Sequence, residues 1–467
     1  MSGPGTTAGT TGAPGDGLRR TEPAPPVRAV HVGLGNFFRA HQAWYTAHAP
    51  DAAEWGIAAF TGRSPDLADA MAAQDGLFTL VTRDADGDVF EVVGAVARAH
   101  ASTDHEAWLG YLADPVVRVV TLTVTETGYV RGTDGGIDLD RPAVAEDLAA
   151  LREDPRALVR SVPARLVAGL LARREAGGGP ITVVPCDNLP DNGAVVARVV
   201  RGLAEALDVS LAAWVDDTVS YATTMVDRIT PEPTDADLET VRRETGTIDR
   251  APVVTEPFSE WVISGSFPGG RPRWEDAGAT LTDDLDPFEQ RKLWLLNGAH
   301  SLLAYVGSGR GLQTVADAVA DPVCRASMEE WWAAASRHLP QPDDELAGYR
   351  AALLDRFANP RMQHRLEQIA MAGSQKLPVR VLPVLRRERE AGADLTPTAR
   401  PLAAWVLHLR GSGATVDDPA ADELVGLAAG ALSEAVQAVL ARLDGGSAAE
   451  PDVVAAVVSA AEDLQAV

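Results

Sequence analysis

The pattern of hydrophobic and polar positions divides the chain into two parts. Before residue 285, short apolar runs rich in β-branched residues occupy residues 27–35, 55–60, 116–125 and 181–186, with helical periodicity between them. The runs are continuous and do not alternate with polar residues, which is typical of strands buried on both faces. Strands alternating with helices predict βαβ units and a parallel sheet. We therefore expect an α/β fold in this part.

From residue 287 to the end, helical periodicity replaces the strand pattern. We place the domain boundary around residues 280–286, with an α/β domain over residues 27–284 and a mainly α-helical domain over residues 285–467. Residues 1–26 are rich in Gly, Thr, Pro and Ala. They lack the apolar core of about 7 to 15 residues that a signal peptide needs, so we predict a disordered tail.

Composition and charge narrow the class of partner. The 467 residues are 46% hydrophobic and 23% charged, as in soluble globular proteins. A net charge of −25 argues against nucleic acid and anionic membranes, and no apolar run approaches the length of about 18 residues that spans a bilayer. The two cysteines offer no disulfide framework or structural zinc site, which favours a cytoplasmic setting. An anionic ligand would require a local cationic pocket.

A glycine pair follows the first predicted strand. A strand that ends in Gly33-x-Gly35 and opens a helix brings backbone N–H groups up to a pyrophosphate, although a structural turn is the alternative. The third glycine of the usual fingerprint is replaced by a phenylalanine, so helix and strand must pack differently. The residues expected to contact the cofactor are Gly33, Gly35, Asn36, Phe37, Phe38 and Arg39.

The end of the second strand bears on the choice of cofactor. An acid there usually holds the ribose of NAD, whereas arginine favours the 2′-phosphate of NADP. This chain has Arg63 first and an acid only at Asp66. The two signals disagree, and Arg63 could equally be a solvated surface residue. The choice of cofactor therefore stays open, with NAD expected and NADP possible.

Lysine is almost absent from the chain. Only Lys292 and Lys376 occur among 41 basic residues. Arginine stays charged, whereas a buried lysine can lose its proton and act as a base, so Lys292 is a candidate catalytic base. On an α-helix at about 100° per residue, Glu289, His300 and Asn297 would lie at about 60°, 80° and 140° from it. A surface ion pair with Glu289 and a core histidine are the alternatives.

Four further residues could bind substrate. Asn188 follows a predicted strand directly and could donate to a substrate oxygen, or form an Asx turn before Pro190. Glu126 and Thr127 hold a similar but weaker position, and Lys376 could contact substrate or cap a helix. No tyrosine lies four residues before either lysine, and no metal-spaced histidines occur. A nicotinamide enzyme of this sequence would use lysine, and no metal, as its base.

Several blocks follow one another along the chain: GLGNFFRAHQ, TLTVTETGY, TVVPCDNLPDNG, TMVDRITP, KLWLLNGAHSLLAYVG and HRLEQIAMAGSQKLP. In this order they resemble the blocks of the mannitol dehydrogenases, or long-chain polyol dehydrogenases, a family that includes fructuronate and tagaturonate reductases. The resemblance covers roughly residues 27–410. It implies a Rossmann-type domain, a helical domain and a metal-free active site. It also implies oxidation of a polyol or aldonate, such as the fructose/mannitol or fructuronate/mannonate pair.

The resemblance also implies residue roles. Lys292 matches the general base of the K-x4-N-x2-H motif, and Asn297 and His300 match its substrate contacts. Asn188 matches a second oxyanion donor, Glu289 a proton-relay acid, and Asp227 an active-site acid. Where many members read NGSH and DGS, this chain has Ala299 and Ala372, which leaves the substrate open.

Two alternative functions stay open. A mannitol-1-phosphate dehydrogenase would keep the chemistry and need a phosphate pocket, for which Arg361, Arg365, Lys376 and Arg380 are candidates. A nicotinamide-binding regulatory protein would keep the fold without turnover. The presence of Lys292, Asn297 and His300 argues against the regulatory protein, which would not need a base.

Overall fold

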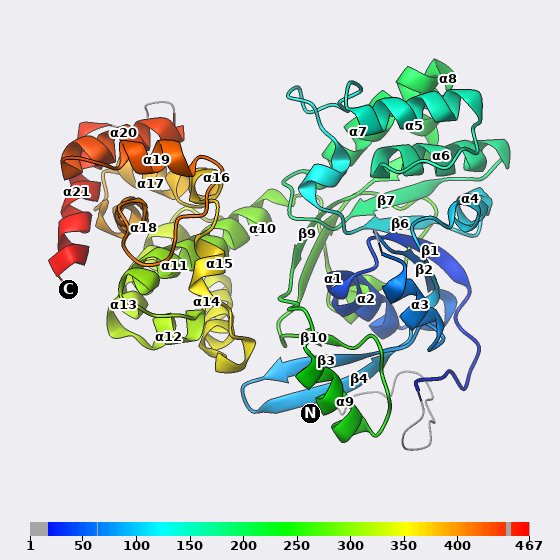
Figure 1. Cartoon of the computed structure of the whole chain (residues 1–467), viewed down its shortest axis with the longest axis horizontal. Coiled ribbons are helices and arrows are strands. Elements are labelled where there is room, and N and C mark those ends of the chain that lie inside the picture. Colours follow the sequence, from blue (N-terminus) through cyan, green and yellow to red (C-terminus); the bar gives the residue numbers. More distant parts are fainter. Residues whose placement is uncertain (1–16, 63, 445–449, 467) are drawn as a thin grey trace. The chain divides into compact units, whose positions relative to one another are not determined.

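The computed structural model describes residues 17–62, 64–444 and 450–466. The chain divides between Leu285 and Asp286 into two compact units (Figure 1). The first contains a parallel sheet and the second is built from helices, so the predicted fold class is confirmed. None of the helices within the described ranges is long and apolar enough to cross a membrane.

The centre of the first unit is a six-stranded sheet in which every neighbouring pair is parallel. The spatial order is β5-β2-β1-β6-β7-β8, which is the order 3-2-1-4-5-6 of dinucleotide-binding domains. Val30 pairs with Ala58 on one side and with Val120 on the other. The strands are β1 (Val27–Val32), β2 (Gly56–Phe60), β5 (Val96–His100), β6 (Val119–Leu122), β7 (Ile181–Pro185) and β8 (Val219–Tyr221).

Both faces of this sheet are covered, which explains the continuous apolar runs. Val30 and Val32 face one core, and their neighbour Ala29 faces the other. The first core is closed by the helices α4 (His105–Ala113), α5 (Pro142–Glu153), α6 (Val162–Glu175), α7 (Asn192–Leu207) and α8 (Val209–Thr218). The second is closed by α1 (Asn36–Ala40), α2 (Gln42–His48) and α3 (Asp66–Ala72), with residues of the smaller sheets.

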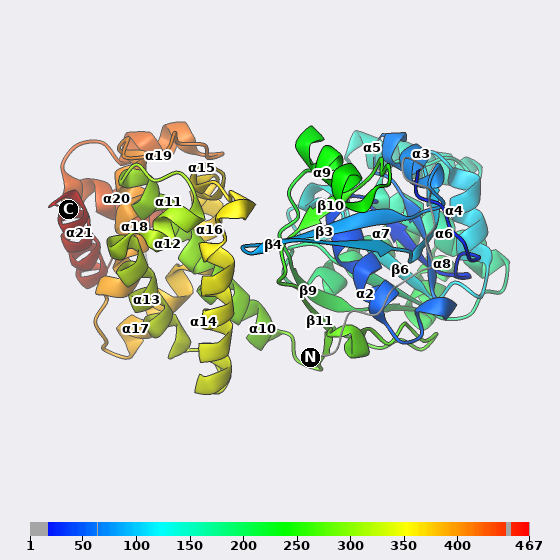
Figure 2. The same cartoon turned by 90° about the horizontal axis from the view of Figure 1, so that it is seen from below.

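Two three-stranded sheets complete the first unit. One has the order β10-β3-β4, and its β3–β4 hairpin extends beyond the parallel sheet (Figure 2). The other has the order β12-β11-β9. Their strands, with the remaining helices of the unit, are β3 (Phe78–Asp84), β4 (Gly87–Val93), β9 (Thr223–Asp227), β10 (Val253–Thr255), β11 (Glu260–Ser264), β12 (Thr280–Leu281), α9 (Asp235–Thr245), η1 (Ala52–Glu54), η2 (Glu126–Tyr129) and η3 (Trp274–Ala277).

The predicted tail is partly wrong. Residues 1–16 lie outside the described residues, but residues 17–26 pack on the first unit. Leu18 is buried, and Arg20 donates to the carbonyl oxygens of Asp75, Gly94 and Val96 at 2.8, 2.7 and 2.9 Å. One apolar side chain and one multivalent guanidinium therefore hold a segment whose composition suggested disorder.

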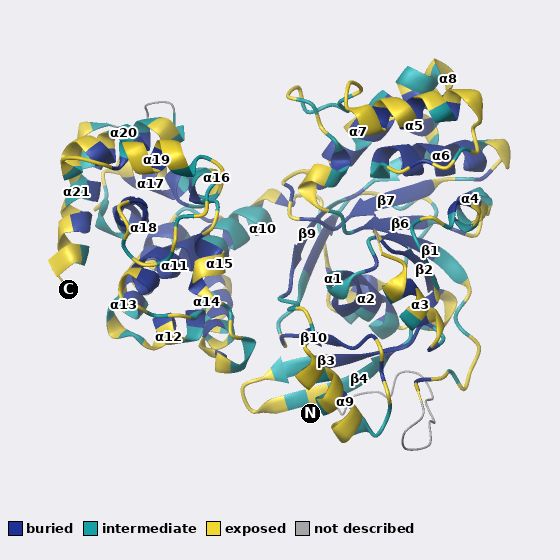
Figure 3. Cartoon of the chain, in the orientation of Figure 1, coloured by how far each residue is buried: buried dark blue, intermediate teal, exposed yellow. Residues whose placement is uncertain are grey.

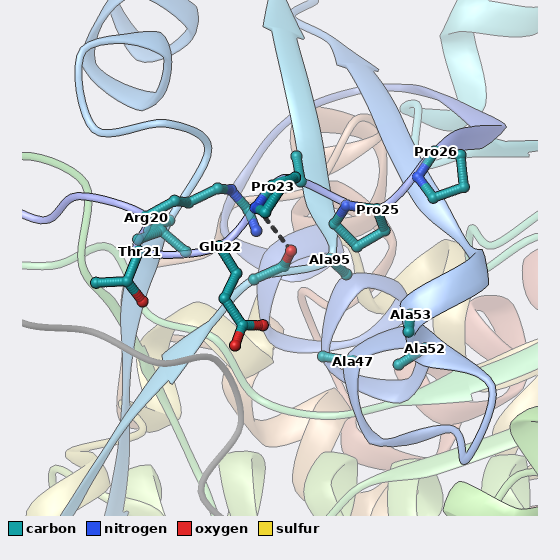
Figure 4. A pocket seen from close by; sticks show the side chains of 13 residues that line it. Arg20, Thr21, Glu22, Pro23, Pro25, Pro26, Ala47, Ala52, Ala53 and Ala95 are labelled. Carbon is teal, nitrogen blue, oxygen red and sulfur yellow. Dashed lines mark hydrogen bonds between the residues drawn. The ribbon is translucent and has the colours of Figure 1, made fainter.

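This segment borders a cavity of about 430 Å³ (Figure 4). The prolines Pro25 and Pro26 lead directly into β1, so the cavity lies at the amino end of that strand. Ligands of open α/β sheets bind at the opposite, carboxyl end. The functional site is therefore expected at the carboxyl ends of the strands.

The second unit is organised around two helices, α11 (Ala299–Gly309) and α18 (Thr396–Leu409), which are buried along most of their length (Figure 3). A short α10 (Asp286–Arg291) and the π-helical η4 (Lys292–Gly298) run without interruption into α11. The other helices are α12 (Val315–Ala320), α13 (Pro322–Ser336), α14 (Asp343–Ala358), η5 (Pro360–Met362), α15 (Leu366–Ala370), α16 (Gly373–Arg380), α17 (Leu382–Glu390), α19 (Ala421–Leu427), α20 (Leu432–Asp444) and α21 (Pro451–Ala466).

Candidate active site

A pocket of about 530 Å³ lies at the carboxyl ends of β6 and β7. Its walls are Phe37 of α1, the loop 123–127 after β6 and the residues 186–188 after β7. The strand order reverses between β1 and β6, and the crevice at such a switch point is where open α/β sheets bind ligands. Asn188 is exposed in this pocket, together with the weaker candidates Glu126 and Thr127.

The glycine pair forms a tight turn beside this pocket. Gly33 has φ +109°, and a Cβ atom there would stand 2.2 Å from the carbonyl oxygen of Thr123. The N–H groups of Gly33 and Leu34 both donate to the carbonyl of Phe60, at 3.0 and 2.9 Å. Only glycine permits this close crossing over the end of β6. Gly35 is extended and leads into α1, which begins at Asn36.

Two of the residues expected to contact the cofactor have buried side chains. Phe38 is fully buried and stacks on His31, with ring centroids 3.6 Å apart. Arg39 is buried too and donates to Gly35 O at 3.1 Å, to Asn36 Oδ1 at 2.6 Å and to the carbonyl of Ala251. Because both side chains face the core, they support the glycine turn from behind and do not line the pocket. Arg63 lies outside the described residues.

Asn188 is held by its neighbours. The buried Tyr129 hydroxyl donates to Asp187 Oδ2, and the other carboxylate oxygen accepts from the N–H of Leu189 at 3.1 Å. Burial raises the pKa of the Asp187 carboxyl, as it raises the pKa of the Tyr129 hydroxyl. Sequence reasoning missed Tyr129, which stands in the TETGY run beside the two weaker candidates.

Asp227 lies in a three-stranded sheet, whereas Asn188 follows β7 of the six-stranded sheet. It is buried at the carboxyl end of β9 and pairs in register with Glu260 of β11. β9 begins two residues after β8, the edge strand of the parallel sheet. The structure therefore places Asp227 in the first unit, outside the walls of the 530 Å³ pocket.

In the second unit, the predicted base lies at the start of a π-helix. Residues 292–298 form η4, in which hydrogen bonds join residues five apart, so Asn297 stands one widened turn beyond Lys292. The α-helical projection had put the two residues about 140° apart, and the π-helix brings them to one face. Glu289 lies on α10 before this turn and His300 on α11 after it. π-Bulges are frequent at functional sites.

His300 is a buried imidazole. Its ring packs against the rings of Phe357 and His364, with centroids 4.5 and 5.1 Å away. Nε2 is buried and has no hydrogen-bond partner among the described residues. Burial, followed by the charges of His364, Arg356, Arg380 and Lys376, holds the pKa of His300 well below its usual value. The ring is therefore neutral at pH 7, with one donor and one acceptor nitrogen.

Cationic side chains gather near this imidazole. Lys376 donates to the carbonyl of Ile369 at 3.2 Å, and Arg380 donates to Ser301 Oγ at 3.3 Å. Burial, followed by the charge of Arg380, lowers the pKa of Lys376 to about 8, and the charge of Asp418 opposes this shift. Neither residue forms an ion pair within the described part of the chain. With Arg356, they form what we call the cationic cluster.

Of the four basic residues considered for a phosphate pocket, only Lys376 and Arg380 are placed in this cluster. Arg365 forms an ion pair with Glu367 at 2.7 Å and is exposed. Ala372 adopts φ +54° and precedes the first residue of the helix that carries Lys376 and Arg380. Across the described residues, no group of three or more His, Cys, Asp or Glu side chains could hold a metal ion.

The sheet order, the glycine turn and the lysine-bearing helical unit define the class of nicotinamide-dependent dehydrogenases with two domains. The chain belongs to the mannitol dehydrogenase family. The model of the family's Rossmann domain matches residues 27–276, and that of its C-terminal domain matches residues 284–465.

Named relatives and solved structures agree with this assignment. The D-mannonate oxidoreductase of Escherichia coli (strain K12) is 38% identical over 397 residues, which is 82% of this chain and 80% of the relative. The substrate-free structure of a D-sorbitol dehydrogenase has a TM-score of 0.87 and 29% identity, covering 95% of both chains. The Pseudomonas fluorescens mannitol 2-dehydrogenase in a ternary complex with NAD and D-mannitol has a TM-score of 0.77 and 34% identity, covering 97% of this chain and 95% of the other.

Proposed function

We propose that the protein transfers hydride reversibly between NAD and a secondary alcohol of an open-chain aldonate or polyol, without a metal. The observation that carries the proposal is the π-helical turn, which brings Lys292 and Asn297 to one face in a chain of this family. An amine that exchanges a proton and an amide that donates to the same substrate oxygen are what this oxidation requires.

The first unit suits a dinucleotide. The close crossing of Gly33 over Thr123 leaves the turn bare of side chains, and the pocket beside it opens at the switch point. When bound, NAD supplies the hydride acceptor or, in the reverse direction, the hydride donor. Phe37 and the loop 123–127 would form the walls of its site. NADP is the alternative cofactor.

Each site residue has a role in this proposal. Lys292 takes the proton of the substrate hydroxyl, and Asn188 and Asn297 donate to the alkoxide that develops. The neutral ring of His300 orients the substrate, because it can donate with one nitrogen and accept with the other. Glu289 passes the proton towards solvent, and Asp227 contacts substrate.

The cationic cluster favours an anionic substrate. Lys376 and Arg380 are half-buried, and neither forms an ion pair among the described residues, although the charge of Asp418 acts on Lys376. A chain with a net charge of −25 repels anions at long range, so this local group of cations favours a ligand that supplies negative charge. A planar carboxylate matches the guanidinium of Arg380. We therefore propose an aldonate and its keto-acid, such as mannonate and fructuronate, ahead of neutral mannitol and fructose.

We also propose that the protein works in the cytoplasm on small sugars, polyols or hexuronates, and not on nucleic acid or membranes. Cys186 and Cys324 are free and buried, which suits a reducing compartment. The strongly negative net charge supports the exclusion of polyanionic partners.

One panel of assays tests the reaction and the substrate class. NADH or NADPH oxidation would be followed with fructuronate, tagaturonate, fructose and fructose 6-phosphate. We expect turnover with a hexuronate and a lower kcat/KM for fructose. Preference for the phosphate would support the phosphate-specific alternative. NADH binding without turnover of any substrate would overturn the proposal and favour the regulatory alternative.

The base is tested by two substitutions. Lys292→Ala should lower kcat by at least about 10²-fold, the usual contribution of general-base catalysis. Lys292→Arg should be almost as damaging, because a guanidinium keeps the charge and cannot give up its proton. Arg325→Ala, which removes an exposed ion pair with Glu329, is a control that should leave kcat unchanged. Turnover near that of the wild type in both Lys292 variants would remove this assignment.

A further inference from the structure

The π-helical turn is held by two consecutive tryptophans from another helix. The indole Nε1 of Trp331 donates to the carbonyl oxygen of Trp294, and that of Trp332 donates to the carbonyl oxygen of Leu295, both at 2.8 Å. The donors belong to α13 and the acceptors lie in the middle of η4. A wider turn shifts each carbonyl from its α-helical partner, and side-chain donors then stabilise it.

The ring of Trp331 also packs closely against the last residue of η4. Gly298 is the last residue of the π-helix, and a Cβ atom there would stand 2.6 Å from Cζ2 of Trp331. The indole ring therefore occupies the space of a side chain at position 298. Trp331 is fully buried and Trp332 is 4% exposed, so neither ring can move aside into solvent.

The same tryptophans connect to the buried imidazole. The ring of Trp332 stacks on that of Phe357 with centroids 6.2 Å apart, and Phe357 packs against His300 at 4.5 Å. One pair of side chains on α13 thus contacts the turn from Lys292 to Gly298 directly and reaches His300 through one ring.

We propose that Trp331 and Trp332 are positioning residues that keep residues 292–298 π-helical and so hold Lys292 and Asn297 on one face. The inference rests on the proposed function. An α-helical turn would return Asn297 to about 140° from Lys292 and separate the proton acceptor from the amide donor. Loss of the indole bonds should therefore lower kcat while the first unit still binds cofactor.

The test compares Trp331→Phe, Trp332→Phe and the double variant with Trp108→Phe. Phenylalanine keeps an aromatic ring and removes the N–H. Trp108 is a matched control, because its buried indole donates to the carbonyl of Arg165 at the same 2.8 Å, in the first unit. We expect at least a tenfold lower kcat in the double variant, with an unchanged NADH dissociation constant and an altered pH profile of kcat. Trp108→Phe should change thermal stability alone.

Amide hydrogen exchange across residues 292–299 provides a second measurement. Each single variant loses one indole hydrogen bond and keeps an aromatic ring, and we expect faster exchange in both. The single variants also carry the test should the double variant fail to fold. Wild-type kcat, pH profile and exchange in folded Trp331 and Trp332 variants would overturn the inference. A wild-type protein without turnover on any substrate of the panel would instead overturn the proposed function.

Discussion

The hydroxyl of Tyr129 donates a hydrogen bond to Asp187, the residue that precedes Asn188. Tyr129 ends η2, which follows β6, and Asp187 follows β7, so the bond joins two neighbouring strand ends beside the pocket. Both groups are buried, and Asp187 also accepts from the N–H of Leu189. The pair therefore sets the conformation of the turn from which Asn188 extends.

Tyr129→Phe tests this relationship. It should leave the Asp187 carboxylate short of a donor, destabilise the first unit by about 1–3 kcal/mol and lower kcat. Removal of an oxyanion donor costs about 10²–10³ in rate, so a loosened Asn188 should cost roughly tenfold. Tyr221→Phe is the matched control, because its buried hydroxyl has no hydrogen-bond partner among the described residues. Equal kcat in the two variants would show that the bond does not orient Asn188.

Gly33→Ala tests the glycine turn. The residue has φ +109° and no room for a Cβ atom, so alanine must displace the loop that crosses Thr123. A left-handed conformation alone costs about 1–2 kcal/mol, and we expect NADH to bind roughly tenfold more weakly. Fluorescence titration with NADH would measure this. Gly110→Ala, at a position with open space, should leave binding intact. Unchanged NADH affinity in Gly33→Ala would show that the cofactor does not bind at the turn of Gly33.

Lys376 should make the binding of an anionic substrate depend on pH. Burial lowers its pKa to about 8, so the ammonium is present below that pH and is lost as the pH rises through it. The KM for fructuronate should therefore rise between about pH 7 and about pH 9, while that for fructose changes less. Lys376→Arg should flatten the rise, because guanidinium keeps its charge. A KM for fructuronate that is constant over this range would show that Lys376 does not bind the substrate carboxylate.

Two buried histidines, His31 and His300, and the half-buried His364 should make the protein less stable in mild acid. Burial lowers the pKa of His31 to about 3 and that of His364 to about 4, and it holds the pKa of His300 well below its usual value. In the unfolded chain these rings take up protons near their ordinary pKa of about 6.5. Stability is therefore fully present above that pH and falls as the pH drops towards the folded values.

Thermal unfolding between about pH 7 and about pH 5 would measure this loss. His364→Gln removes one of the three rings, and its melting temperature should fall less over this interval than that of the wild type. An equal fall in the two proteins would show that His364 does not titrate as its burial requires.

Local sequence was sufficient for the fold class. Continuous apolar runs predicted a parallel sheet, because only strands covered on both faces bury such runs. The glycine pair indicated a turn that positive φ at Gly33 requires. The tail was wrong for residues 17–26, since composition cannot reveal that Arg20 finds carbonyl acceptors more than 50 residues away.

Contacts between residues that are far apart in the sequence could not be predicted from the local pattern. An ideal helical projection assumes 3.6 residues per turn, whereas the turn from Lys292 to Gly298 is π-helical and bonded to indoles 37 residues further on. The partner of Asp187 lies 58 residues before it, and the cations near His300 come from α14 and α16. Periodicity reports which face of a segment is buried. Packing between segments decides which groups lie at that face, and it decided the positions of Lys292, Asn297 and His300.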